Sequence, residues 1–305
     1  MSHSSTGAAT SPEARGCLAQ IFLSPGDRRL RSGWRLLIHS LLLLIITLPL
    51  ELATLFIPGT SAGLPFDLLS PLPSLLGITV ATILARYMLD RRSFSSLGFK
   101  MDNRVVPDLL FGIVLSGLMM GMIFVAEWSL NWVTLSGTAL DRFSMPTVIR
   151  LTFEALWLYL CVGFSEELLS RGYHLQNLQE GSNTTLAVLV SSGIFGILHL
   201  SNPNATLVST AGIFCAGVFL AYAYLRTQQL WLPIGVHIGW NFFEGTVFGF
   251  PVSGLSGFHL LEQTVTGPEW WTGGAFGPEA GLILLPVLLL GTVAISLYTR
   301  SRNLA

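Results

Sequence analysis

Long apolar runs separated by short polar segments dominate the chain. Eight of these runs approach the length of about 20 residues that a helix needs to cross the hydrocarbon core of a bilayer. The runs cover approximately residues 36–57, 68–88, 107–127, 147–170, 184–200, 207–225, 230–250 and 279–299. The fifth run is short, and the fourth contains charged side chains. The pattern predicts an all-α, polytopic integral membrane protein with about eight transmembrane helices.

The composition agrees with a membrane protein. Hydrophobic residues make up 51% of the chain and charged residues only 11%, whereas a soluble domain contains about 25% charged residues. No soluble domain interrupts the apolar runs. We therefore expect a single membrane domain over residues 34–305, preceded by a cytoplasmic N-terminal segment over residues 1–33. The net charge of −1 gives no indication of nucleic-acid binding.

The basic residues predict the orientation of the chain in the bilayer. With eight spans and both termini on the same side, that side holds 14 of the 16 Lys and Arg residues, Arg171 included. The opposite side holds only Arg142 and Arg150. Lys and Arg are enriched in cytoplasmic loops. We therefore expect a multi-pass protein with both termini in the cytoplasm, located in the cell membrane if the host is prokaryotic.

Two adjacent glutamates and an arginine lie within or beside the fourth apolar run. A charged side chain at the centre of a membrane helix costs about 2.5 to 3.5 kcal/mol on insertion scales, so such residues are usually functional or paired. Glu167 and Arg171 are four residues apart, with the acid first, which favours an ion pair on one helix face. Glu166 is rotated by about 100° from Glu167 and remains available for proton exchange. The alternative is a purely structural cluster in which both glutamates bind Arg171.

Three further polar residues occur in the following apolar runs. His199 ends the run Phe-Gly-Ile-Leu-His, which begins at Phe195. His237 and Asn241 are four residues apart and therefore project from one face of a helix. An Asn side chain donates and accepts hydrogen bonds without titrating, which suits it to hold an oxyanion or a water. Taken alone, each of these residues is equally typical of interhelical hydrogen bonding.

In combination, the three motifs resemble those of the CPBP family of intramembrane proteases. That family includes the CAAX prenyl endopeptidases and relatives associated with bacteriocin immunity, and it was formerly called the Abi family. The matching positions lie within about residues 160–245: Glu166, Glu167 and Arg171, then Phe195 and His199, then His237 and Asn241. By this resemblance, Glu166 and His199 would activate a water. His237 and Asn241 would stabilise the oxyanion, and Glu167 and Arg171 would support the site.

The resemblance implies an endopeptidase that hydrolyses a peptide bond of a membrane-associated protein or peptide inside the bilayer. Because water must reach the site, we expect an intramembrane polar cavity, open to the cytoplasm near Arg171. No cofactor is required for this reaction. If a catalytic zinc were bound, its ligands would be Glu166, His199 and His237, with an open fourth position.

Two other functions are compatible with the same residues. A transporter or channel could use the buried polar side chains as an ion or proton path. A catalytically silent scaffold could use them for packing alone. Cleavage of a substrate, and its loss in Glu166→Gln, would distinguish the protease from both alternatives.

Overall fold

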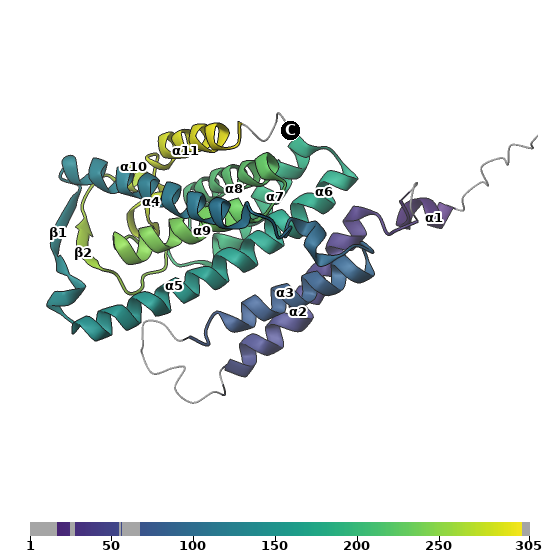
Figure 1. Cartoon of the computed structure of the whole chain (residues 1–305), viewed down its shortest axis with the longest axis horizontal. Coiled ribbons are helices and arrows are strands. Elements are labelled where there is room, and N and C mark those ends of the chain that lie inside the picture. Colours follow the sequence, from purple (N-terminus) through teal and green to yellow (C-terminus); the bar gives the residue numbers. More distant parts are fainter. Residues whose placement is uncertain (1–16, 25–27, 55, 57–67, 301–305) are drawn as a thin grey trace, which may run out of the picture.

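The computed structural model describes residues 17–24, 28–54, 56 and 68–300, so about half of the predicted N-terminal segment and residues 301–305 lie outside the described residues. Most of the described chain is helical (Figure 1). The helices of the bundle are α2 (Ser32–Thr54), α3 (Leu72–Met88), α4 (Val105–Ser129), α5 (Met145–Glu167), η3 (Leu168–His174), α6 (Leu175–Gly181), α7 (Thr184–Leu198), α8 (Leu207–Thr227), α9 (Trp231–Asn241), η5 (Phe242–Val247) and α11 (Leu284–Tyr298).

Each predicted apolar run coincides with a helix, which confirms the helical membrane protein. Five helices are long and apolar enough to cross a bilayer by length and composition: α2, α4, the continuous α5–α6 helix, α7 with the short η4 (His199–Ser201), and α8. The apolar helices α3 and α11 are shorter. The count of eight spans therefore stays a prediction.

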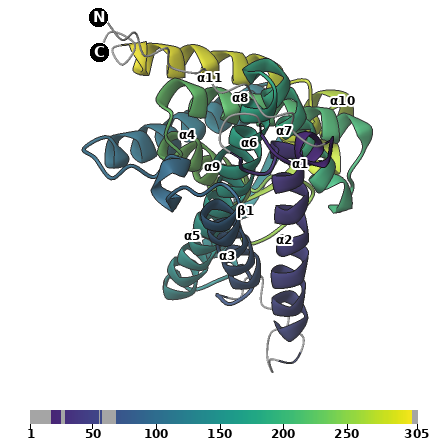
Figure 2. The same ribbon diagram turned by 90° about the vertical axis from the view of Figure 1, so that its right-hand side faces the viewer.

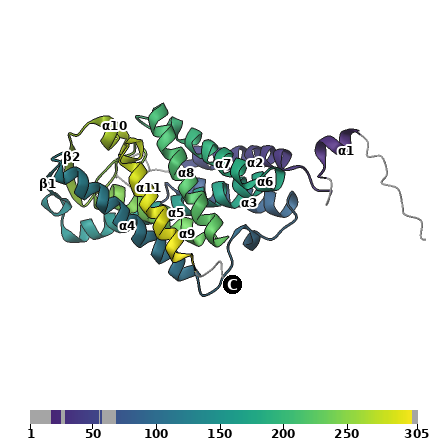
Figure 3. The same cartoon turned by 90° about the horizontal axis from the view of Figure 1, so that it is seen from above.

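One end of the bundle carries the irregular structure (Figures 1 and 3). A two-stranded antiparallel sheet pairs β1 (Val133–Thr138) with β2 (Leu261–Val265), and its register shifts between Leu135 and Gly137. The neighbouring short helices are η2 (Ala139–Asp141), α10 (Glu269–Thr272), η6 (Gly274–Phe276) and η7 (Pro278–Ala280). We call this the hairpin end. The apolar pattern predicted helices only, so it missed these strands.

The opposite end carries most of the arginines. Here α1 (Cys17–Phe22) precedes α2, and η1 (Phe94–Leu97) follows α3 (Figures 1 and 3). Figure 2 shows α2 and α3 side by side along one flank of the bundle. We call this the arginine end.

The helix that contains the two glutamates is longer than predicted. α5, η3 and α6 form one continuous helix of 37 residues, about 55 Å long at 1.5 Å per residue. Arg171 therefore lies within this helix and is only 2% exposed. The chain turns back at Ser182, and Asn183 caps the next helix by accepting a hydrogen bond from the Leu186 N–H.

The helix α9 lies at the centre of the bundle, and its residues 232–241 are all buried. It packs closely against α4 because glycines remove the side chains between the two backbones. A Cβ atom at Gly235 would lie 2.4 Å from the Leu109 carbonyl oxygen, and one at Gly239 would lie 2.7 Å from the Ile113 Cα. This contact fixes the helix from which His237 and Asn241 project.

Candidate active site

Three helices bring the four predicted catalytic residues to one cavity. Glu166 comes from the end of α5, His199 follows α7, and His237 and Asn241 come from α9. All four line a cavity of about 550 Å³ inside the bundle. The predicted convergence of these side chains is therefore present in the fold, while their catalytic roles stay predictions.

The Glu166 carboxylate lies between the two histidines. Its Oε2 atom is 3.9 Å from His199 Nε2 and 3.8 Å from His237 Nε2. These separations exceed direct hydrogen bonds, and the buried Oε2 has no hydrogen-bond partner within the described part of the chain. Because a buried carboxylate oxygen needs a partner, the arrangement suits a bridging water between the acid and the imidazoles.

Each histidine is oriented by its other ring nitrogen. His199 Nδ1 lies 2.8 Å from the Phe195 carbonyl oxygen, which can only accept a hydrogen bond, so Nδ1 carries a proton. His237 Nδ1 lies 2.8 Å from Glu167 Oε1, and the carboxylate likewise accepts. The neutral form of each ring then leaves Nε2 unprotonated and facing Glu166. Such outer contacts fix both the tautomer and the orientation of a functional histidine.

Glu167 and Arg171 form an ion pair next to His237. Arg171 Nη1 donates to Glu167 Oε1 at 2.8 Å, which confirms the predicted pair, and Arg171 Nη2 donates to the Gly217 carbonyl at 3.0 Å. The Arg171 guanidinium also lies over the Phe195 ring, 4.5 Å from its centroid. Glu167 Oε1 therefore serves both Arg171 and His237. As the spacing predicts, Glu167 pairs with the arginine, and Glu166 faces the cavity.

Two π-helical segments adjoin the site. The segment η3 begins directly after Glu167, and η5 begins directly after Asn241. A π-helical turn changes the direction in which the following side chains project, and such turns occur often at functional sites. The sequence pattern could not predict these segments. Apolar periodicity indicates a helix, but it does not indicate whether the backbone hydrogen bonds follow the α or the π pattern.

Sequence reasoning also missed a carboxyl group on the cavity wall. Glu279, in η7 before α11, lines the cavity, and its Oε2 accepts a hydrogen bond of 2.5 Å from the Ser253 hydroxyl. Glu244 lies nearby and is fully buried beside Trp240. The spacing of the motifs could not reveal Glu279, whereas Glu244 lies three residues after Asn241.

The cavity extends toward the hairpin end. Its lining loop residues are Ser70, Asn202, Val252, Ser253, Leu255, Ser256, Gly257 and Glu279. The loop after α7 is tied to this region because Asn202 Nδ2 donates to the Ser253 carbonyl oxygen at 3.0 Å. The sequence predicts an opening near Arg171. Arg171 is buried and is not among the described residues that line this cavity.

Glu166, His199 and His237 are the ligands that the sequence predicts if a zinc ion is bound. Their donor atoms are of the right chemical type for zinc. Within the described residues, however, no group of three His, Cys, Asp or Glu side chains is placed so that it could hold a metal ion.

Comparisons with known proteins agree with the motif region. Residues 148–243 match the family model described as type II CAAX prenyl endopeptidase Rce1-like. Over 111 residues the chain is 32% identical to the "Putative membrane peptidase YdiL" of Bacillus subtilis (strain 168). That alignment covers 36% of this chain and 41% of the relative, so the chain matches less than half the length of this curated protein. The family match includes every motif residue named above.

Proposed function

We propose that this chain is a CPBP-type intramembrane endopeptidase acting on a membrane-associated protein or peptide. The match of residues 148–243 to the Rce1-like endopeptidase model supports this proposal. The observation that carries this proposal is the position of Glu166. Its unpaired carboxylate oxygen faces the Nε2 atoms of two histidines, inside a cavity enclosed by apolar helices.

In the proposed reaction, Glu166 and His199 hold a water and Glu166 takes its proton. The water oxygen forms a bond to the peptide carbonyl carbon, and the carbonyl oxygen becomes an oxyanion. Asn241 and protonated His237 donate hydrogen bonds to this oxyanion, and Glu167 stabilises the positive charge on His237. The C–N bond then breaks as Glu166 delivers its proton to the leaving nitrogen. The products are a carboxylic acid and an amine.

The proposed substrate enters from the hairpin end as an extended segment. A helical segment keeps its carbonyl groups in backbone hydrogen bonds, so the scissile bond must lie in an unwound or non-helical stretch. We further propose eight spans, with both termini and the arginine end in the cytoplasm, because Lys and Arg favour that side. The cavity then opens toward the outer face.

Glu166→Gln tests the proposed function. Purified wild-type protein should cleave a membrane-peptide mixture, and Glu166→Gln should reduce cleavage to background while the helical circular dichroism is unchanged. Glu154→Gln is the control, because Glu154 pairs with Arg150 outside the cavity. Since the proposed reaction uses no metal, a divalent-metal chelator should leave wild-type cleavage intact. Equal cleavage by Glu166→Gln would contradict the proposal. Ion flux through liposomes without cleavage would favour a transporter.

A further inference from the structure

A second cavity lies at the arginine end, far from the proposed catalytic residues. It has a volume of about 720 Å³. Four arginines line it, Arg29, Arg31, Arg35 and Arg92, together with the first turn of α2 (Ser32, Gly33 and Trp34) and with Glu180. Nothing in the proposed peptidase reaction uses this pocket.

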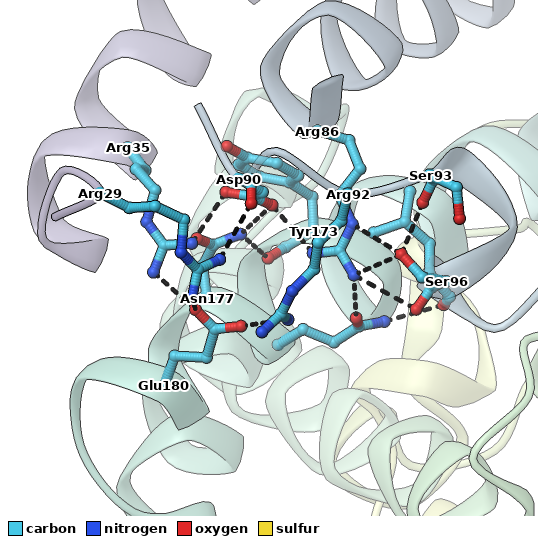
Figure 4. Close-up of polar contacts among 12 residues, drawn as sticks. Arg29, Arg35, Arg86, Asp90, Arg92, Ser93, Ser96, Tyr173, Asn177 and Glu180 are labelled. Atoms are coloured by element: carbon cyan, nitrogen blue, oxygen red, sulfur yellow. Dashed lines mark hydrogen bonds and ion pairs between the residues drawn. The ribbon is translucent and has the colours of Figure 1, made fainter. Parts of the chain in front are cut away.

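Two carboxylates bind three of the arginines that line the pocket (Figure 4). The Glu180 carboxylate accepts hydrogen bonds from Arg29, from Arg35 at 2.7 Å and from Arg92. The Asp90 carboxylate accepts from Arg35 and Arg86, each at 2.8 Å. The fourth, Arg31, donates from Nε to the Leu23 carbonyl oxygen at 3.2 Å. The carboxylate contacts join α2, α3 and α6 and hold three guanidinium groups of the pocket in place before any ligand binds.

The acids do not balance the arginines. Residues 28–35 and 86–92 contain seven arginines and one acid, Asp90. Counting Glu180 as well leaves five positive charges in excess, and four if Asp27 is included. Guanidinium groups bind phosphate oxygens through paired hydrogen bonds. The start of a long helix adds backbone N–H groups that favour an anion. The pocket therefore has the chemistry of a phosphate site.

The pocket also adjoins an apolar strip. Leu37 lines the pocket and is exposed, and Leu41, Leu44 and Leu48 continue along the same face of α2. Their spacing of four, three and four residues places them in one line along the helix. A ligand with its phosphate among the arginines would therefore lay any hydrocarbon chain along this strip.

We propose that this pocket binds an anionic phospholipid, with the head-group phosphate among Arg29, Arg31, Arg35 and Arg92 and the acyl chains along the exposed leucines of α2. A soluble phosphate compound would use the arginines but not the strip. Basic pockets between membrane helices are suited to anionic head groups. Since Glu180 ends the helix that carries Glu166, the lipid would sit against the end of the catalytic helix.

Native mass spectrometry of the detergent-purified full chain tests this proposal. We expect phosphatidylglycerol to be retained in preference to phosphatidylcholine. Arg31→Gln/Arg92→Gln should weaken phosphatidylglycerol retention by roughly thirtyfold, because each arginine near an anionic surface contributes about a five- to sixfold effect. Arg142→Gln/Arg150→Gln removes the same charge at or near the hairpin end and should retain the lipid like the wild type.

Three results would overturn the proposal. The first is equal retention of the two lipids, and the second is unchanged retention by Arg31→Gln/Arg92→Gln. The third is displacement of the lipid by glycerol phosphate at equal concentration, which would show that the acyl chains contribute nothing. Circular dichroism checks that the variant is folded. If the variant is not folded, Arg31→Lys/Arg92→Lys takes its place. This second variant keeps the charge but lacks the planar guanidinium groups, so it should show intermediate retention.

Discussion

At the scale of single residues, one carboxylate oxygen of Glu167 connects the two halves of the site. It accepts from His237 on α9 and from Arg171, which in turn binds the Gly217 carbonyl on α8. The spacing of the glutamates predicted the Arg171 contact, because both partners lie on one helix. It could not predict the His237 contact, which joins residues far apart in the sequence. For the same reason it missed Glu279.

Glu167→Gln should damage both stability and cleavage. It leaves the buried Arg171 without a carboxylate, which costs about 3–5 kcal/mol in comparable buried pairs. It also removes the anion that orients His237, and loss of such outer partners typically lowers activity about 10- to 100-fold. Thermal unfolding in detergent and peptide cleavage measure the two effects separately.

The double variant Glu167→Gln/Arg171→Gln separates these roles. It removes the uncompensated buried charge, so much of the unfolding free energy should return. Cleavage should remain low because His237 still lacks its carboxylate. Full recovery of cleavage in the double variant would mean that Glu167 only neutralises Arg171.

At the scale of secondary-structure elements, the site depends on helices that are short or irregular. α7 ends at Leu198, so His199 can turn into the cavity, and α9 gives way to η5 after Asn241. The apolar runs correctly predicted where helices occur. They could not predict the π-helical segments, because burial and hydrogen-bond register in the folded bundle decide them.

Gly239→Ala should disturb the site through the packing of α9 on α4. A Cβ atom at Gly239 would lie 2.7 Å from the Ile113 Cα and 2.8 Å from its carbonyl oxygen, so the helices must separate. Overpacking of this kind costs about 1–3 kcal/mol. The shift of α9 moves His237 and Asn241, so we expect a lower unfolding midpoint and slower cleavage.

Gly193→Ala is the matched control. A Cβ atom at Gly193, within α7, would meet nothing within 4 Å. Alanine is a better helix former than glycine by up to about 1 kcal/mol, so this variant should be as stable as the wild type or slightly more stable. If both variants behaved alike, close helix contact at Gly239 would not be what positions the site.

At the scale of the whole molecule, the two ends differ in charge and in what they contribute to the cavity of the candidate site. The arginines gather around α2, α3 and α6, whereas loops of the hairpin end line part of the cavity. The sequence predicted that the basic residues gather on one side, because most Lys and Arg residues lie in the loops on one side of the predicted spans. The direction of the opening could not be predicted, because it depends on how the loops before α3, after α7 and before α11 fold together.

Thiol labelling in whole cells tests this arrangement. In a background with the native cysteines (Cys17, Cys161 and Cys215) replaced by serine, single cysteines would be introduced at Ser93, Ser136 and Ser256. Ser93 lies at the arginine end, Ser136 lies on β1, and Ser256 lines the cavity of the candidate site. With the arginine end in the cytoplasm, an impermeant maleimide should label Ser136→Cys and Ser256→Cys in intact cells.

Ser93→Cys should react only after the cells are permeabilised. The reverse pattern at all three positions would show that the chain has the opposite orientation in the membrane, with the cavity still open at the hairpin end. The position of the opening would be contradicted if Ser256→Cys and Ser93→Cys reacted under the same condition while Ser136→Cys reacted under the other. The experiment therefore separates the orientation, which depends on the charge distribution, from the route of water and substrate, which depends on the folded loops.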